Sequence, residues 1–134
     1  MKLENQVCSL ELSEKLKSLG VSQKSLFYWW KYGDNPVLAI KTSNDQAIRS
    51  IKNFDYFTTA GHKDYEYCSA FTVAELGEML PYGYSSYKTR INCFSCHFTK
   101  TEKNRNIDET IDNNEANCRA KMLIYLLENK LIKL

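Results

Sequence analysis

The chain has 134 residues, which suits a single domain over residues 1–134 with a modest hydrophobic core. Its 18 basic and 16 acidic residues nearly balance, which argues against a protein that works by neutralising the phosphates of a nucleic-acid duplex. The opening residues carry early glutamates in place of a signal peptide, and no apolar run approaches the ~20 residues that span a bilayer. We therefore expect a cytoplasmic protein without a membrane partner, whose five cysteines are free thiols.

The first predicted helix covers residues 9–19. Ser9 can cap its N-terminus, and Leu12, Leu16 and Leu19 recur at helical spacing. Gly20 can adopt the left-handed conformation that ends a helix. The pattern therefore predicts an amphipathic helix that packs one leucine stripe against the core.

A β-hairpin is predicted next, because the β-prone runs 25–32 and 37–42 flank the turn residues Gly-Asp-Asn-Pro. Side-chain alternation places Trp29 on one face with Phe27 and Lys31. This face is either buried under a helix or offers Trp29 as a surface on which a ring or a partner chain can stack.

Residues 43–67 give weaker signals, which favour a short helix near Ile48 and Ile51 and then an exposed loop. The second clear helix is predicted over 73–80. Thr72 and Glu75 form the T-x-x-E pattern of a capping box, and Pro81 with Gly83 ends the helix. This short helix should be held at both ends.

The segment YGYSSYKTR that follows is predicted to be a loop leading into a strand. It brings hydroxyls, cations and aromatic rings together, and these groups hold the phosphates and bases of nucleotides. A solvated turn is the competing interpretation, because no glycine-rich phosphate loop is present. The candidate ligand-binding residues are Trp29, Tyr84, Ser86, Tyr87, Lys88 and Arg90.

The segment INCFSCHFTK contains Cys93, Cys96 and His97 in the order C-x-x-C-H, a pattern used by haem attachment sites, zinc sites and dithiol centres. Its β-branched and aromatic residues instead predict a strand. Cys96 would then share a core face with Phe94 and Phe98, while Cys93 and His97 point to the other side. Cysteines on opposite faces cannot grip one metal, so we assign no metal ligand and no cofactor, and a metal or redox role is the less favoured alternative.

The last predicted helix covers residues 114–131. Asn113 or Asn114 can cap it, and a core face runs along Ala116, Ala120, Leu123, Ile124, Leu127 and Leu131. A second apolar ridge consists of Cys118, Met122 and Tyr125. We expect this ridge to be either deeply buried or an interface with another protein or a second copy of the chain.

Together these elements predict an α+β fold. A small antiparallel sheet of three to four strands, built from the 25–32 and 37–42 hairpin and the 87–99 strand, should pack with three helices.

Three segments carry a resemblance to a known family. YCSAFTVAELGEMLP and EANCRAKMLIYLLENKLI resemble the signature segments of a family of small uncharacterised bacteriophage and prophage proteins, and VCSLELSEKLKSLGVSQKSLFYWW resembles the opening of that family. The order of elements is also similar to the phage ABA sandwich domain. The resemblance implies a phage origin, action in the host bacterial cytoplasm and a compact α+β fold; it implies no catalytic residues.

No metalloprotease, nucleophile-elbow or paired-carboxylate pattern is present, so we do not expect an enzyme. We predict a phage-encoded binding protein that counters a host defence process by sequestering a small nucleotide-type ligand. The main alternative is an inhibitor of a host protein, which would bind through the ridge on the last helix or through residues 54–67.

Overall fold

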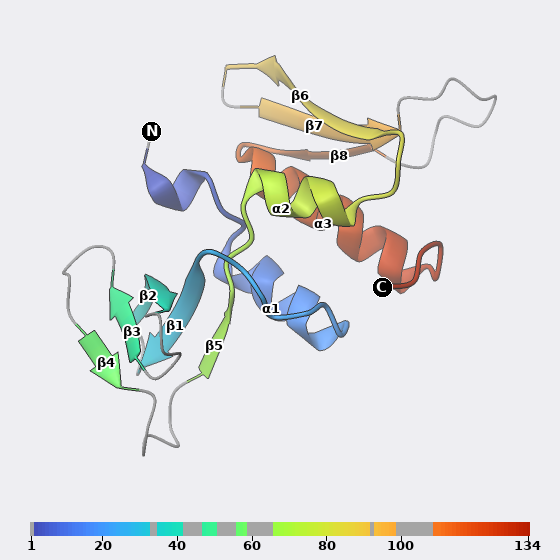
Figure 1. Cartoon of the computed structure of the whole chain (residues 1–134). Coiled ribbons are helices and arrows are strands. Elements are labelled where there is room, and N and C mark those ends of the chain that lie inside the picture. The colour runs from blue at the N-terminus through green and yellow to red at the C-terminus, as the bar shows by residue number, and fades with distance from the viewer. Residues whose placement is uncertain are drawn as a thin grey trace.

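The computed structural model describes residues 2–32, 35–41, 47–50, 56–58, 66–91, 93–98 and 109–134 (Figure 1). The helical elements are a short 3-10 turn, η1 (Leu3–Asn5), and the α-helices α1 (Leu10–Ser18), α2 (Val73–Met79) and α3 (Glu115–Glu128). The strands are β1 (Tyr28–Tyr32), β2 (Asn35–Lys41), β3 (Ala47–Ser50), β4 (Tyr56–Thr58), β5 (Glu66–Ser69), β6 (Tyr84–Arg90), β7 (Cys93–Phe98) and β8 (Glu109–Asp112). The predicted α+β class is confirmed.

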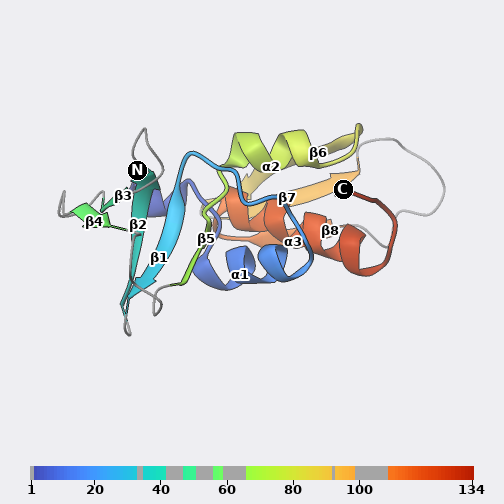
Figure 2. The ribbon, with the colours of Figure 1, turned by 60° about the horizontal axis from the view of Figure 1, so that its bottom comes forward.

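The strands form two antiparallel sheets where the sequence suggested one. One sheet has the order β4-β3-β2-β1-β5, and the other has the order β6-β7-β8. The five-stranded sheet stands at one end of the molecule (Figure 2), and the helices lie on the side of the three-stranded sheet that faces it (Figure 1). The predicted hairpin and the predicted 87–99 strand are therefore separated, because each pairs with strands close to it in the sequence.

Two local predictions were wrong in the same way. The YGYSSYKTR segment, predicted to be a loop, contains strand β6, so the predicted 87–99 strand is divided between the end of β6 and β7, with a turn residue at Ile91. Residues 47–50, within the predicted short helix, are strand β3, which pairs with β2. In both places strand pairing overrides a weak local preference. Most of the remaining 43–65 segment lies outside the described residues.

The main core is built around α3, which packs on β6, β7 and β8 on one side and on α1 and α2 on the other. Leu16 of α1, Leu76 of α2 and Cys96 of β7 are all fully buried around this helix. The proposed interface ridge is mostly part of this core, since Cys118 and Met122 have no exposed surface. The prediction that they form a contact surface was wrong, because a helix packed from both sides buries both of its apolar faces. The third member of the ridge, Tyr125, is half-buried.

The starts of the three α-helices match the sequence prediction. The predicted end of the last helix at residue 131 was wrong, because α3 ends at Glu128 and Leu131, a predicted core residue, is 58% exposed. The side chain of Thr72 accepts a hydrogen bond from Glu75 N, and the Glu75 carboxylate accepts one from Thr72 N, which completes the capping box. Glu75 also accepts from the backbone of Leu26, so the start of α2 anchors the segment that leads into β1. Gly20 has the positive φ of 87° expected after α1. No helix among the described residues has the length and apolar character needed to cross a bilayer.

Candidate ligand-binding cleft

A cleft of about 1050 Å³ opens where the N-terminal segment, β1, the start of α2, β6, β7 and the start of α3 meet. Two aromatic rings, one lysine and a set of side-chain amides and hydroxyls surround it. The lining residues are Glu4, Asn5, Gln6, Ser9, Leu10, Trp29, Thr72, Val73, Ala74, Lys88, Phe94, Asn113, Asn114, Glu115 and Asn117. No His or Cys lies among these described lining residues.

Trp29 forms one wall of the cleft. Its ring is half-buried beside the small cluster of Val7, Leu38 and Ala70, and its Nε1 donates a hydrogen bond of 2.8 Å to the carbonyl oxygen of Cys8. This bond fixes the plane of the ring. Trp29 is thus covered on part of its surface and lines the cleft with the rest, and its use as a stacking surface stays a prediction.

Lys88 and Phe94 form another part of the cleft lining. They are cross-strand partners on β6 and β7, so their side chains share the face of the three-stranded sheet that packs toward α3. Phe94 is half-buried and contacts the main core, whereas Lys88 is exposed. This part of the lining therefore offers an ammonium group next to an aromatic ring.

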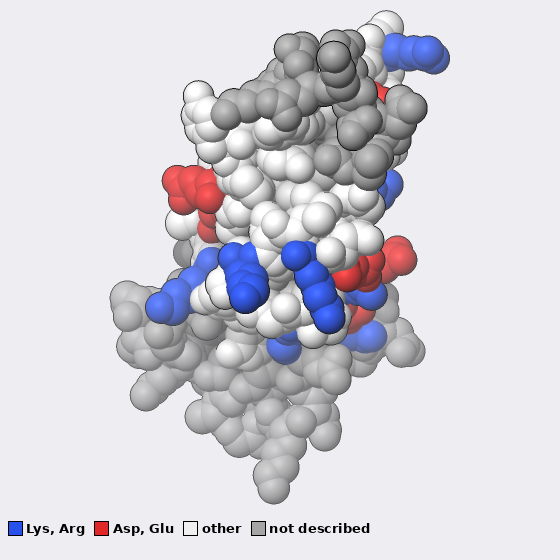
Figure 3. Space-filling model, turned by 90° about the vertical axis from the view of Figure 1, so that its right-hand side faces the viewer, with Lys and Arg blue, Asp and Glu red and all other residues white. Residues whose placement is uncertain are grey.

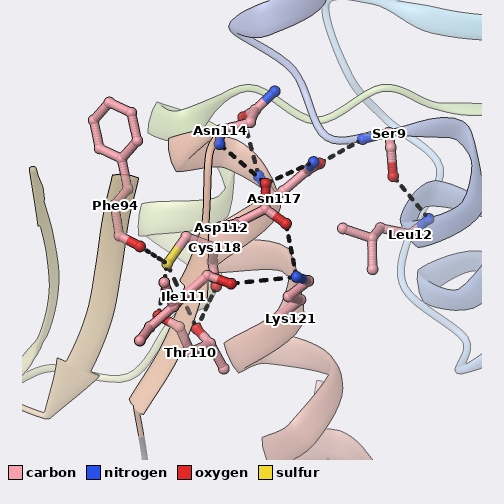
Figure 4. Close-up of polar contacts among 10 residues, drawn as sticks. All are labelled: Ser9, Leu12, Phe94, Thr110, Ile111, Asp112, Asn114, Asn117, Cys118 and Lys121. Atoms are coloured by element: carbon pink, nitrogen blue, oxygen red, sulfur yellow. Dashed lines mark hydrogen bonds and ion pairs between the residues drawn. The ribbon is translucent and has the colours of Figure 1, made fainter. Parts of the chain in front are cut away.

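Residues 6–9, called here the N-terminal strap, are hydrogen-bonded to the start of α3 (Figure 4). These bonds lie at the floor of the cleft. Asn117 Oδ1 accepts from Ser9 N at 2.7 Å, and Asn114 Nδ2 donates to Val7 O at 3.1 Å. Asn117 Nδ2 in turn donates to Asp112 Oδ1 at 3.2 Å. Asn114, the capping residue of α3, and Asn117, one turn later, therefore hold the strap in place.

Asp112 is the acidic centre of this network. Its Oδ2 lies 2.7 Å from Lys121 Nζ, and its Oδ1 accepts from Asn114 N at 3.0 Å. Burial alone would raise the pKa of Asp112. The hydrogen bonds from Lys121, Asn114 and Asn117 outweigh burial and hold the pKa below its ordinary value of 3.8. The network is therefore stable with Asp112 ionised.

Arg119, which the sequence analysis missed, ties the cleft walls together. Its Nε donates to Ser86 Oγ at 2.6 Å, and its Nη1 donates to Val73 O at 3.0 Å. Ser86 Oγ donates in turn to Glu115 Oε1 at 2.5 Å. Ser86, a candidate ligand-binding residue, is thus committed to holding Glu115 and Arg119. The spacing of Glu115 and Arg119, four residues apart on one helix, is the sequence signal that could have identified the pair.

The remaining candidates do not line the cleft. Tyr84 packs against Phe98 with ring centroids 5.1 Å apart, and Tyr87 points to the outer face of the sheet, where it meets His97 edge to face at 5.0 Å. Arg90 is exposed near the end of β6, opposite Cys93. Because β6 is a strand, its side chains alternate between two faces and cannot converge on one ligand. Of the predicted set, the structure brings only Trp29 and Lys88 together at the cleft.

The C-x-x-C-H segment is the predicted strand. Cys96 is fully buried and Phe94 packs against the same core, while Cys93 is partly exposed. Burial raises the pKa of the Cys96 thiol to about 12, so this thiol stays protonated. Within the described part of the chain, no three His, Cys, Asp or Glu side chains are grouped so that they could hold a metal ion.

Comparison with protein-family models, curated proteins and solved structures finds no match for the chain. The resemblance to phage proteins therefore stays a prediction. The surface charge does not indicate a particular kind of partner either. Basic side chains cross the middle of one face, and acidic side chains lie on both sides of them (Figure 3). The cleft is the feature of the described structure from which a function can be inferred.

Proposed function

We propose that the protein is a non-enzymatic binding protein that sequesters a small nucleotide-type ligand in the cleft between Trp29 and Lys88. The observation that carries this proposal is that Trp29, Phe94 and Lys88 line one cleft of about 1050 Å³. Aromatic rings provide stacking surfaces for a base, and an ammonium group provides a partner for a phosphate.

The polar lining supports a ligand with edges that form hydrogen bonds. Asn5, Gln6 and Asn113 line the cleft, and all three residues are exposed. Side-chain amides both donate and accept, as the edges of nucleobases do. The volume exceeds that of most pockets for drug-sized molecules, roughly 300–1000 Å³, so a nucleotide would fit.

The biological role that we propose follows from the resemblance to phage proteins. A phage protein in the host bacterial cytoplasm that removes a nucleotide signal from solution would counter a host defence process without catalysis. Such sequestration needs a stoichiometric amount of protein and a tight site. It does not need a reactive side chain at the cleft.

The test is calorimetric titration of the purified chain with a panel of mononucleotides. Lys88→Ala should weaken binding by about five- to tenfold, the effect of losing one charged contact to a phosphate. Arg90→Ala is the matched control, because it removes another exposed cation from the same strand but outside the cleft. Trp29→Leu should weaken nucleotide binding because the base loses its stacking surface, and a smaller heat of binding from the phosphate contact should remain.

Two results would contradict the proposal. One is the absence of binding at millimolar nucleotide. The other is an equal loss of affinity in Lys88→Ala and Arg90→Ala, which would indicate diffuse charge attraction with no defined site. Either result would favour the alternative that the protein inhibits a host protein.

A further inference from the structure

A second hollow lies beside the cleft, on the side of α1 and β5. It has a volume of about 680 Å³ and includes Lys17, Lys31 and Tyr67 in its lining. Trp29 and Leu10 line both this hollow and the cleft. The indole of Trp29 therefore borders two binding spaces.

The second hollow carries its own cations. Lys31 follows Trp29 by two positions on β1, so the two side chains share a face of that strand, and Lys31 is exposed. Lys17 Nζ donates to the carbonyl oxygen of Tyr67 at 2.8 Å and lies 5.5 Å from the centroid of the Tyr67 ring. These contacts hold the ammonium in place, and its three N–H groups leave donors available for an anion. Glu14 is the acidic residue in the described lining.

Cations thus line both of the hollows that Trp29 borders. Lys88 lies in the cleft, and Lys17 and Lys31 lie in the second hollow. In a nucleotide chain the 5′ and 3′ phosphates leave the sugar on opposite sides. A base stacked on Trp29 would direct one phosphate to each hollow.

We propose, building on the function proposed above, that the ligand is a nucleotide with phosphate groups on both its 5′ and its 3′ side, as in a linear or cyclic dinucleotide. The base stacks on Trp29, one phosphate pairs with Lys88, and the other phosphate pairs with Lys31 and Lys17. Both hollows are needed for full affinity, whereas a nucleoside monophosphate occupies only one of them.

The test compares adenosine 5′-monophosphate, adenosine 3′-monophosphate and adenosine 3′,5′-bisphosphate by calorimetry. The bisphosphate should bind about tenfold more tightly than either monophosphate, because it adds a phosphate contact to two lysines. Lys31→Ala should remove most of this gain, weaken the monophosphate whose phosphate occupies the second hollow, and leave the affinity for the other monophosphate nearly unchanged. Lys24→Ala is the matched control, since Lys24 is exposed but lines neither hollow.

The outcomes separate the two proposals. Monophosphate binding without a gain for the bisphosphate would overturn the two-phosphate ligand and leave the proposed function standing. An equal reduction of the bisphosphate's gain in affinity by Lys24→Ala and by Lys31→Ala would also overturn the two-phosphate ligand. No binding of any nucleotide would overturn both. Where the gain holds, the linear dinucleotide pApA and cyclic di-AMP are titrated next. At least one of them should bind more tightly than the monophosphates, and the tighter one shows whether the ligand is a linear or a cyclic dinucleotide. Weaker binding of both would refute a dinucleotide ligand.

Discussion

Arg119 offers the sharpest test of how the cleft is held together. The guanidinium joins three elements, because it donates to Ser86 on β6 and to Val73 at the start of α2 while it sits on α3. Replacing it with alanine removes both hydrogen bonds and leaves the Val73 carbonyl and the Glu115 carboxylate with fewer partners. We expect Arg119→Ala to be among the most destabilising polar substitutions in the described chain.

The magnitude follows from the contacts. A hydrogen bond to a charged group contributes about 1.5–3 kcal/mol, and two of them are lost. The side chain of Arg119 is 20% exposed, which reduces each contribution, and the ion pair with Glu115 at 3.7 Å adds little. The expected loss is about 2–4 kcal/mol, a large share of the roughly 5–15 kcal/mol that stabilises a typical domain.

Urea unfolding followed by circular dichroism measures this loss as a shift of the transition midpoint. Lys15→Ala is the control, because Lys15 forms a closer ion pair, 2.7 Å from Glu128, but with side chains that are 50% and 42% exposed. It should cost less than about 1 kcal/mol. Arg119→Lys should fall between the two, since lysine keeps the charge but not the planar fork. Equal midpoints for Arg119→Ala and Lys15→Ala would refute the reasoning.

Three further predictions concern the same region. A Cβ at Gly77 would overlap the Arg119 guanidinium, so Gly77→Ala should lower the free energy of unfolding by about 1–3 kcal/mol in a urea titration, and an unchanged midpoint would contradict this placement of Arg119. The pKa of Asp112 is lower in the folded chain than in the unfolded chain, so its stabilising contribution is complete above pH ~4 and disappears as the pH falls through the folded pKa. Asp112→Asn should therefore make the free energy of unfolding depend less steeply on pH in this range. Parallel curves for the variant and the parent chain would argue against the network. Cys93 is the one cysteine that is not buried, so iodoacetamide should modify it first in the native protein and reach the other four only after unfolding, whereas rapid labelling of more than one thiol would contradict the core assignment.

Local signals in the sequence were sufficient for the helices and their caps. Ser9, Thr72 and Asn114 were expected to cap helices, and each side chain accepts a backbone hydrogen bond from the residue three positions later. These contacts span one turn, so the sequence around them determines the geometry. The faces of β7 were predictable for the same reason, because alternation depends on the strand alone.

The pairing of strands depends on the whole chain, and here the sequence was less informative. Nothing near Tyr84 or Lys88 shows that β6 pairs with β7 instead of forming a loop. Once it is a strand, alternation sends Tyr87 to the outer face and directs Ser86 toward Arg119. Of the residues predicted to bind a ligand, only Trp29 and Lys88, which come from two distant elements, line the cleft.

The hydrogen bond from Ser9 to Asn117 joins residues 108 positions apart, and it has a consequence during protein synthesis. The hairpins can form as soon as they leave the ribosome, since their contacts are local. The strap lacks its partners on α3 until that helix has been translated, so these contacts can form only after every described strand has been synthesised. Nascent chains that lack α3 would then carry Trp29 and Lys88 without the contacts that hold the strap beside the cleft.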